Sequence, residues 1–252
     1  MTRALESWLR VEHTTFCPGC GHGILLGAVL RACDELSLER RRLLFVSGIG
    51  CAAWIPSPNI EADTLHTLHG RAVAYATGAK LVKPELTTLV VSGDGDLSSI
   101  GGNHLIHAAR RDVDLTVICA NNQIYGMTGG QTASTTPLGC LTATDPRGTT
   151  ARPFDLCALV RAAGARYAAR WPVTRPRPLT DSIKRAIGTP GFAFVEAISP
   201  CPTQFGRRNR FDDLAQLYDH LSGLCVDREQ ARGLDRDQRA RHFVIGEWSD
   251  DD

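Results

Sequence analysis

The sequence contains no apolar run that approaches the roughly 20 residues needed to cross a bilayer, and Met1–Glu6 lacks the apolar core of a secretory signal. It also lacks a surplus of charge of one sign, because its 28 Lys and Arg residues nearly balance its 27 Asp and Glu residues and leave a net charge of +1. We therefore expect no membrane-spanning segment, no nucleic-acid or other polyanion partner, and a cytoplasmic location.

The number of cysteines is nine, so they cannot all form disulfide pairs within the chain. In a chain without an export signal this argues against a disulfide framework. The chain is not poor in apolar residues: they make up 43% of its 252 residues, which excludes a disordered chain. We expect one domain over residues 1–252. Five cysteines occur singly and are predicted to be small buried apolar side chains: Cys33, Cys119, Cys140, Cys157 and Cys225.

Apolar strands alternate with segments of helical periodicity along the chain. This alternation predicts an α/β fold with a mostly parallel sheet and helices on both faces. From about residue 203 the chain turns polar, and we expect surface helices or a tail that faces another subunit. Helices are predicted at 21–36, 70–82, 101–111, 154–163 and 180–187, and strands at 43–46, 87–91, 115–119 and 192–196.

Four notable loops follow predicted strands. They are Gly48–Ala52, Gly93–Asp96, Asn121–Met127 and the segment around Cys201. Ligands of open parallel sheets bind outside the carboxyl ends of the strands, so these loops are expected to meet at one edge.

An acidic residue and an amide follow two of these strands and suit a magnesium site. Asp94 stands between two glycines, and Asn122 follows it by 28 positions, after a predicted helix and strand. A carboxylate, an amide oxygen and a nearby backbone carbonyl are donors that Mg²⁺ accepts, with water and phosphate oxygens completing its shell. The pattern predicts a diphosphate held through Mg²⁺, although each half alone is a common turn. A dinucleotide site matches less well, because Gly48-Ile49-Gly50 lacks the third glycine.

Four cysteines stand apart from the other five. Cys17 and Cys20 form a C-x-x-C pair, Cys51 follows a strand, and Cys201 lies between two prolines. Two thiolates from one turn and two from distant loops suit either zinc or an iron–sulfur cluster. The spacing alone leaves a redox dithiol or structural thiols open.

Taken together, these motifs resemble a known family. Gly93-Asp94-Gly95 followed by Asn121-Asn122 is similar to the thiamine diphosphate motif. With the segments 17–23, 48–51, 68–72 and 201–204, the chain resembles the β subunit of 2-oxoacid:ferredoxin oxidoreductases over about residues 13–211. Segments 101–111 and 122–131 are most similar to the 2-oxoglutarate branch.

The resemblance implies a set of site residues. It assigns Mg²⁺ to Asp94, Asn122 and the carbonyl of Ile124. It assigns a [4Fe–4S] cluster to Cys17, Cys20, Cys51 and Cys201. Thiamine diphosphate would lie among Ile49, Gly50, Cys51, Ala52, His69, Gly95, Asp96, Gly126 and Met127.

The implied reaction is a CoA-dependent oxidative decarboxylation of a 2-oxoacid, with electrons passed through the cluster to ferredoxin and the reverse direction left open. Because the chain shows no upstream domain for the aminopyrimidine of the cofactor, we expect an α subunit to complete the site, as a heterodimer or a dimer of heterodimers. Small ferredoxin-like subunits would also be compatible with the family. Two other classes stay open: a non-redox thiamine diphosphate decarboxylase or synthase half, and a zinc or iron–sulfur scaffold.

Among the polar residues, His69 and Arg71 are the predicted catalytic pair. His69 precedes a predicted helix start, where anions bind well, and Arg71 would pair with a substrate carboxylate or with an internal acid. His104 and His107 share a helical face and are predicted to be structural. Trp54 stands near the position where the family more usually has a basic residue. A basic group there would bind a second substrate carboxylate, and Trp54 cannot take that part. The similarity of segments 101–111 and 122–131 to the 2-oxoglutarate branch nevertheless makes 2-oxoglutarate the first choice of substrate, with pyruvate and other 2-oxoacids kept open.

Overall fold

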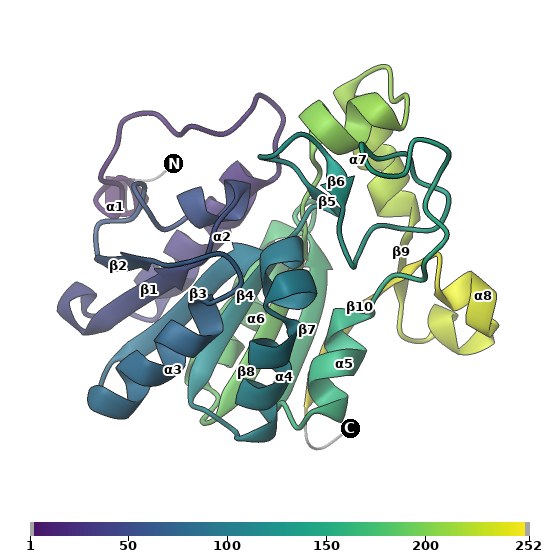
Figure 1. Cartoon of the computed structure of the whole chain (residues 1–252). Helices are drawn as coiled ribbons and strands as arrows, with labels where there is room; N and C mark the ends of the chain where they lie inside the picture. Colours follow the sequence, from purple (N-terminus) through teal and green to yellow (C-terminus); the bar gives the residue numbers. More distant parts are fainter. Residues whose placement is uncertain (1–2, 250–252) are drawn as a thin grey trace.

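The strands of this protein form one eight-stranded main sheet in a computed structural model that describes residues 3–249 (Figure 1). The strand order is β2-β1-β3-β4-β8-β7-β10-β9. The first six strands are parallel to their neighbours, β10 is antiparallel to β7, and β9 is parallel to β10. The strands are β1 (Leu43–Ser47), β2 (Asp63–His66), β3 (Thr87–Gly93), β4 (Leu115–Asn121), β7 (Tyr167–Pro172), β8 (Phe192–Ile198), β9 (Cys225–Asp227) and β10 (Phe243–Ser249).

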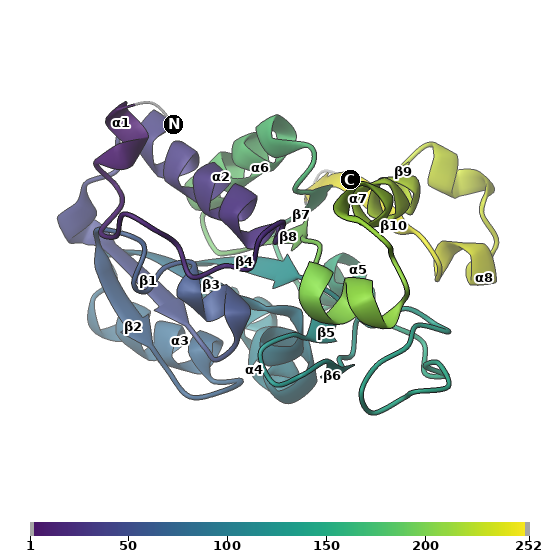
Figure 2. The same cartoon turned by 90° about the horizontal axis from the view of Figure 1, so that it is seen from above.

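Helices cover both faces of this sheet (Figure 2). The first face carries α2 (His22–Glu35) and α6 (Pro176–Gly188), which pack against each other. The second face carries α3 (Ala72–Val82), α4 (Gly102–Arg110) and α5 (Leu156–Ala162). The predicted α/β fold, with a mostly parallel sheet between two helical layers, is therefore confirmed.

The sheet divides the apolar core into two parts, one on each face, because successive side chains along a strand point to opposite faces. On β3, Leu89 and Val91 belong to the core under α2 and α6, whereas Val90 belongs to the core under α3, α4 and α5. Strands β4 and β8 are buried at every position. These strands are accordingly the ones whose sequences read as continuous apolar runs.

The predicted helices and strands are all present, with ends shifted by a few residues, and β2, β7, β9 and β10 are additions to the main sheet. Strand β2 is a short edge strand whose side chains are mostly exposed, and β7 carries Arg170 in its middle. Neither segment therefore shows the apolar run of a buried strand. The remaining short elements are α1 (Arg3–Glu6), η1 (Arg40–Arg42), η2 (Cys51–Trp54), η3 (Gly95–Ile100), β5 (Ile124–Tyr125), β6 (Gln131–Thr132), η4 (Pro202–Gly206), α7 (Leu214–Gly223), η5 (Gln230–Gly233) and α8 (Arg236–Arg239).

The segment after residue 203, predicted as surface helices or a tail that faces another subunit, also contributes to the core and to the main sheet. Leu217 and Leu221 of α7 are buried against Phe205, and β10 joins the main sheet beside β7. Because this region contains many charged residues, its sequence does not reveal the short apolar stripe with i,i+4 spacing in α7 or the strand β10. Figure 1 shows α7 and the β5–β6 hairpin together at one end of the sheet. Residues 250–252 of this region lie outside the described residues.

No helix within residues 3–249 combines the length and the apolar character that a membrane crossing requires.

Candidate functional site

The loops that follow β1, β3 and β4 surround one cavity at the carboxyl ends of these strands. We call it the loop cavity. Every residue that the resemblance assigned to thiamine diphosphate or Mg²⁺ lies in its wall, whereas Arg71 does not. The wall consists of Ile49, Gly50, Cys51, Ala52, His69, Gly93, Asp94, Gly95, Asp96, Asn122, Ile124, Tyr125, Gly126, Met127 and Thr128.

Asp94 and Asn122 lie against each other in this wall. Asp94 is 1% exposed, and one of its carboxylate oxygens accepts the backbone N–H of Asn122 at 3.3 Å. The side-chain oxygen of Asn122 accepts the N–H of Ile124 at 3.2 Å. Burial raises the pKa of Asp94 to about 6, while the hydroxyl of Thr135 and the N–H of Asn122 act in the opposite direction. The structure thus places the three residues predicted for Mg²⁺ next to one another in the wall of the loop cavity.

Two residues near this pair were not predicted. Thr135 donates its hydroxyl to the second carboxylate oxygen of Asp94, and it comes from the long loop between β6 and α5. Gln123 has a φ of 66° and is 1% exposed. Its backbone carbonyl accepts the hydroxyl of Thr136, which fixes the turn that places Asn122 and Ile124 on the same side. A threonine in a loop without a motif gives no sequence signal for this role.

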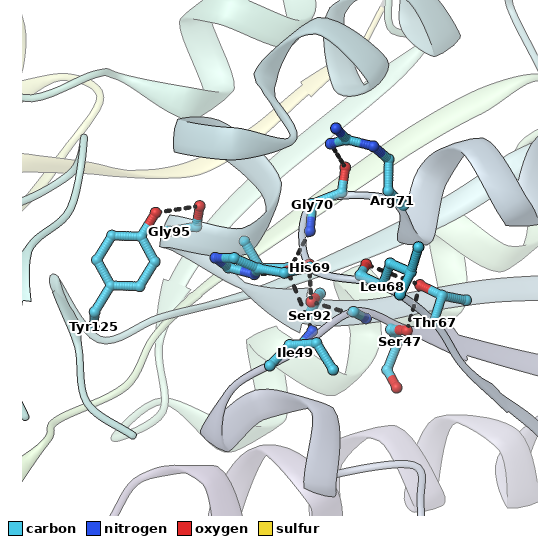
Figure 3. Close-up of polar contacts among 12 residues, drawn as sticks. Ser47, Ile49, Thr67, Leu68, His69, Gly70, Arg71, Ser92, Gly95 and Tyr125 are labelled. Atoms are coloured by element: carbon cyan, nitrogen blue, oxygen red, sulfur yellow. Dashed lines mark hydrogen bonds and ion pairs between the residues drawn. The ribbon is translucent and has the colours of Figure 1, made fainter. Parts of the chain in front are cut away.

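His69 is held by the carboxylate of Asp96. Its Nδ1 lies 2.5 Å from Asp96 Oδ1, and its ring meets Tyr125 edge-on with the ring centres 5.9 Å apart. The hydroxyl of Tyr125 donates to the carbonyl of Gly95 at 3.0 Å. In Figure 3, His69 lies beside Ile49, Gly70 and Ser92, with Tyr125 and Gly95 to one side. Asp96 itself is 2% exposed.

Arg71 lies next to this group but outside the wall of the loop cavity. Its guanidinium donates to the carbonyl of Gly70 at 3.2 Å (Figure 3). No carboxylate within residues 3–249 forms an ion pair with it. The internal acid that the sequence left open is therefore not among the described residues, and a role toward a substrate carboxylate stays a prediction.

The four selected cysteines line a second cavity, which we call the thiol cavity. The N–H of Gly21 donates to the carbonyl of Pro200 at 3.2 Å, so the C-x-x-C turn lies directly against the segment that carries Cys201. Burial raises the pKa of Cys20 to about 12 and that of Cys51 to about 11, and the neighbouring thiols contribute to both shifts. The wall of the thiol cavity consists of Thr15, Phe16, Cys17, Cys20, Cys51, Trp54, Asn122, Gly126, Met127, Cys201, Thr203 and Gln204.

The two cavities share part of their walls. Cys51, Asn122, Gly126 and Met127 belong to both. A Cβ atom built on Gly126 would lie 3.5 Å from the sulfur of Cys51 and 3.6 Å from that of Cys201. Gly126, in the shared wall, therefore lies close to the sulfurs of two of the four cysteines.

The arrangement of donors distinguishes one metal ion from a larger group. Within residues 3–249 no three His, Cys, Asp or Glu side chains are placed to hold a single metal ion. Zinc would need its thiolates at about 2.3 Å from one point, whereas a four-iron cluster spreads its ligand sulfurs around its own volume. Four thiols around a common cavity fit the cluster better than zinc.

The remaining histidines and cysteines lie outside both cavities. His107 accepts a hydrogen bond from Arg110 within α4, and burial lowers the pKa of His104 on the same helix. Of the five single cysteines, Cys33, Cys119 and Cys157 are buried as predicted. The prediction is wrong for Cys140 and Cys225, which are only partly buried, because Cys140 lies in the loop between β6 and α5 and Cys225 begins the short edge strand β9.

Comparisons with known proteins agree with this geometry. Residues 48–197 match the family described as "Thiamine pyrophosphate enzyme, C-terminal TPP binding domain". The chain is 46% identical over 241 residues to a protein of Methanothermobacter marburgensis named 2-oxoglutarate synthase subunit KorB, covering 96% of this chain and 84% of that protein. It is 41% identical over 196 residues to a 2-oxoacid:ferredoxin oxidoreductase subunit beta of Saccharolobus solfataricus, covering 77% and 64% of the two chains.

A solved structure shows the same fold. It is the 2-oxoglutarate:ferredoxin oxidoreductase from Magnetococcus marinus with 2-oxoglutarate, coenzyme A and succinyl-CoA bound. The TM-score is 0.86 at 32% identity, and the match covers 98% of this chain and 84% of that one. The resemblance found in the sequence is thereby confirmed: the chain belongs to the β subunits of the 2-oxoacid:ferredoxin oxidoreductases, with a thiamine pyrophosphate-binding domain over residues 48–197.

Proposed function

We propose that the protein is the β subunit of a 2-oxoglutarate:ferredoxin oxidoreductase. In the proposed reaction 2-oxoglutarate, CoA and oxidised ferredoxin give succinyl-CoA, carbon dioxide and reduced ferredoxin, and two electrons leave through a [4Fe–4S] cluster. The names of the relatives and of the solved neighbour support this choice of substrate. Pyruvate and other 2-oxoacids are the alternatives that the assay below distinguishes.

The observation that carries the proposal is that Cys51 lines both cavities. It follows β1 directly, and its turn begins at Gly50, whose φ of 126° favours glycine. Cys51 would therefore lie next to both an electron donor bound in the loop cavity and an electron acceptor bound in the thiol cavity. A thiamine enzyme without redox chemistry has no use for four thiols at this place.

The loop cavity has the donors and walls that thiamine diphosphate and Mg²⁺ require. Asp94, Asn122 and the carbonyl of Ile124 would hold Mg²⁺. Exposed apolar side chains of Ile49 and Met127, 40% and 47% exposed, would contact the uncharged part of the cofactor. Thiamine diphosphate supplies the electron sink that lets carbon dioxide leave a 2-oxoacid, and the protein binds and orients it.

The thiol cavity has the donors that a [4Fe–4S] cluster requires. Cys17, Cys20, Cys51 and Cys201 would each supply one thiolate. The hydrogen bond between Gly21 and Pro200 fixes the two segments that carry three of them. Zinc on the same thiols could not accept an electron, so an iron-free preparation would contradict this part of the proposal.

A partner subunit would cover the loop cavity. Leu68 and Trp54, near the two cavities, are 66% and 37% exposed. Large apolar side chains at a cavity rim are typical of a surface that another protein covers. We propose an α subunit in a heterodimer or a dimer of heterodimers, ferredoxin as the acceptor, and a cytoplasmic location, with the reverse, carboxylating direction open to the same site.

The test is anaerobic copurification of the chain with its α partner, followed by CoA-dependent reduction of ferredoxin or a viologen. We expect reduction with 2-oxoglutarate to exceed that with pyruvate and branched 2-oxoacids, and the chain alone to be inactive. Reduction that favours pyruvate would contradict the substrate, and a colourless, iron-free complex that still decarboxylates would indicate the non-redox alternative. Failure to bind thiamine diphosphate with Mg²⁺ would favour a metal scaffold without this activity.

A further inference from the structure

Asp96 accepts hydrogen bonds from four donors that come from two separate loops and from the end of β3. Its Oδ1 accepts the backbone N–H groups of Ile49 at 3.1 Å and Gly70 at 2.7 Å, together with Nδ1 of His69 at 2.5 Å. Its Oδ2 accepts the hydroxyl of Ser92 at 2.7 Å. The carboxylate thus joins the loop after β1, the turn before α3 and the end of β3.

Three of these donors converge on Oδ1. An ionised carboxylate has about four acceptor positions, two on each oxygen, and no donor, so the surrounding chain fully occupies Oδ1, whereas Oδ2 accepts one hydroxyl. A Cβ atom on Gly48 would lie 2.0 Å from Asp96 Oδ2, so the loop after β1 also packs directly on this group. Although Asp96 belongs to the wall of the loop cavity, a direct contact of Oδ1 with a cofactor would require the loss of one of these bonds.

The contact with Asp96 Oδ1 determines which nitrogen of His69 carries hydrogen. Because Asp96 can only accept, Nδ1 of His69 must donate. In a neutral imidazole the other nitrogen, Nε2, is then a hydrogen-bond acceptor. His69 lines the loop cavity, and its Nε2 has no hydrogen-bond partner in the described part of the chain. The edge-on contact with Tyr125 limits rotation of the ring.

We propose that Asp96 is a positioning residue that holds His69 in the Nδ1–H form, so that Nε2 accepts a hydrogen bond or proton from a group bound in the loop cavity. This assignment rests on the proposed function in one respect: it takes thiamine diphosphate and a 2-oxoacid as the molecules that bind in the loop cavity. For Oδ1 of Asp96 it replaces a direct cofactor contact with an action through His69. The loop after β1 also carries Cys51, and Ser92 precedes Asp94 by two residues, so the same carboxylate links segments that line the two cavities.

The first test reads the tautomer directly. The full chain is labelled with ¹⁵N in its histidine rings, and the His69 signals are identified by their loss in His69→Gln. We expect the neutral ring to show hydrogen on Nδ1 in the wild type and a mixture of tautomers in Asp96→Asn. The variant Ser92→Ala, which removes a donor on the other oxygen, should retain the wild-type His69 signals. Hydrogen on Nε2 in the wild type would overturn the proposal.

The second test separates positioning from a structural contribution. In the complex with the α subunit, Asp96→Asn should lower kcat about 10²-fold, as a small misplacement of a reacting group does, with little change in the affinity for thiamine diphosphate. Thr77→Ala, whose hydroxyl bonds within α3, is the control and should match the wild type. A loss of cofactor affinity with unchanged kcat would instead indicate a direct contact of Asp96 and overturn the assignment. If the wild type binds no thiamine diphosphate, the proposed function fails, whereas the tautomer measurement still decides the inference.

Discussion

His22 and Ser199 are 177 positions apart in the sequence and join through a buried hydrogen bond of 2.8 Å between Nδ1 and Oγ. His22 begins α2 two residues after Cys20, and Ser199 precedes Cys201 by two residues. No Cβ fits on Gly21 between them, because it would lie 2.5 Å from Ser199 Oγ. This pair therefore fixes the C-x-x-C turn against the segment of the fourth cysteine.

The first prediction concerns this pair. Ser199→Ala removes the partner of a fully buried imidazole, which costs about 1–3 kcal/mol when a buried polar group loses its bond. We expect lower iron content per chain and faster loss of the cluster in air, measured by iron analysis and visible absorbance. Ser222→Ala, at an exposed serine of α7, is the control. A variant with full iron content and normal air stability would show that the pair does not support the cluster.

The second prediction concerns the Mg²⁺ donors. Asp94→Ala should abolish the Mg²⁺-dependent binding of thiamine diphosphate and leave the iron content intact, because Asp94 lines only the loop cavity. Binding is measured by calorimetric titration with and without Mg²⁺. Asp63→Ala, an exposed acid on β2, should bind the cofactor normally. Retained binding in Asp94→Ala would refute the predicted magnesium site.

The third prediction concerns Cys201, for which we expect the opposite result: the cluster is damaged and the cofactor still binds. Cys201→Ser should damage the cluster, since oxygen replaces one of four thiolates, while thiamine diphosphate still binds. The partly buried Cys140 lies outside both cavities, so Cys140→Ser should keep its iron. Visible absorbance and electron transfer to a viologen measure the difference. Normal values in Cys201→Ser would remove Cys201 from the ligand set.

The sequence was sufficient for the parts of this site that follow buried strands. Asp94 and Cys51 come directly after apolar strands, and the topology of a parallel sheet brings such loops to one edge. Thr135 could not be predicted, because its loop has no periodicity and its contact with Asp94 depends on the path of some 20 residues between β6 and α5. The role of Asp96 could not be predicted for a different reason. Its four donors come from two loops and the end of β3, and two of these donors are backbone N–H groups, which no sequence pattern reveals.

Strand β7 was missed for a similar reason. Arg170 interrupts the apolar pattern of β7, and its charge is compatible with burial because Glu196 accepts a bond from it at 2.7 Å and Asp155 accepts another. Its NH1 also donates to the carbonyl of Val244 on β10. A charged residue in a strand and an acidic residue in another each read as surface positions until the fold pairs them.

The fourth prediction concerns the wall between the cavities. Alanine at Gly126 would place its Cβ at ordinary contact distance from the sulfurs of Cys51 and Cys201, so Gly126→Ala should retain iron and cofactor. Valine would add two methyl groups in this narrow space and should reduce both, because a bulky group in a packed site forces its neighbours apart. Iron analysis and cofactor titration measure the two effects. Equal behaviour of both variants would show that the wall is not tightly packed.

The fifth prediction concerns acid stability. Asp155 caps the N-terminus of α5 by accepting the N–H of Ala158 at 3.1 Å and also bonds Arg170. The charge and the hydrogen bond of Arg170 outweigh burial, so the pKa of Asp155 lies below its ordinary value in the folded protein. A carboxyl group with a lowered pKa contributes stability above its unfolded pKa, and this contribution is lost as the pH falls through the folded value.

Urea unfolding of the wild type should therefore show a decline in the free energy of unfolding as the pH falls below about 4, the range in which an ordinary Asp titrates. Asp155→Asn keeps a capping side chain, because Asn caps helices as well as Asp does, but it removes the charge that pairs with Arg170. We expect it to lower stability at pH 7 by about 1 kcal/mol and to show a weaker decline in acid. The exposed Asp63→Asn serves as the control. A pH dependence identical in Asp155→Asn and the wild type would show that the Asp155–Arg170 pair does not couple folding to protonation.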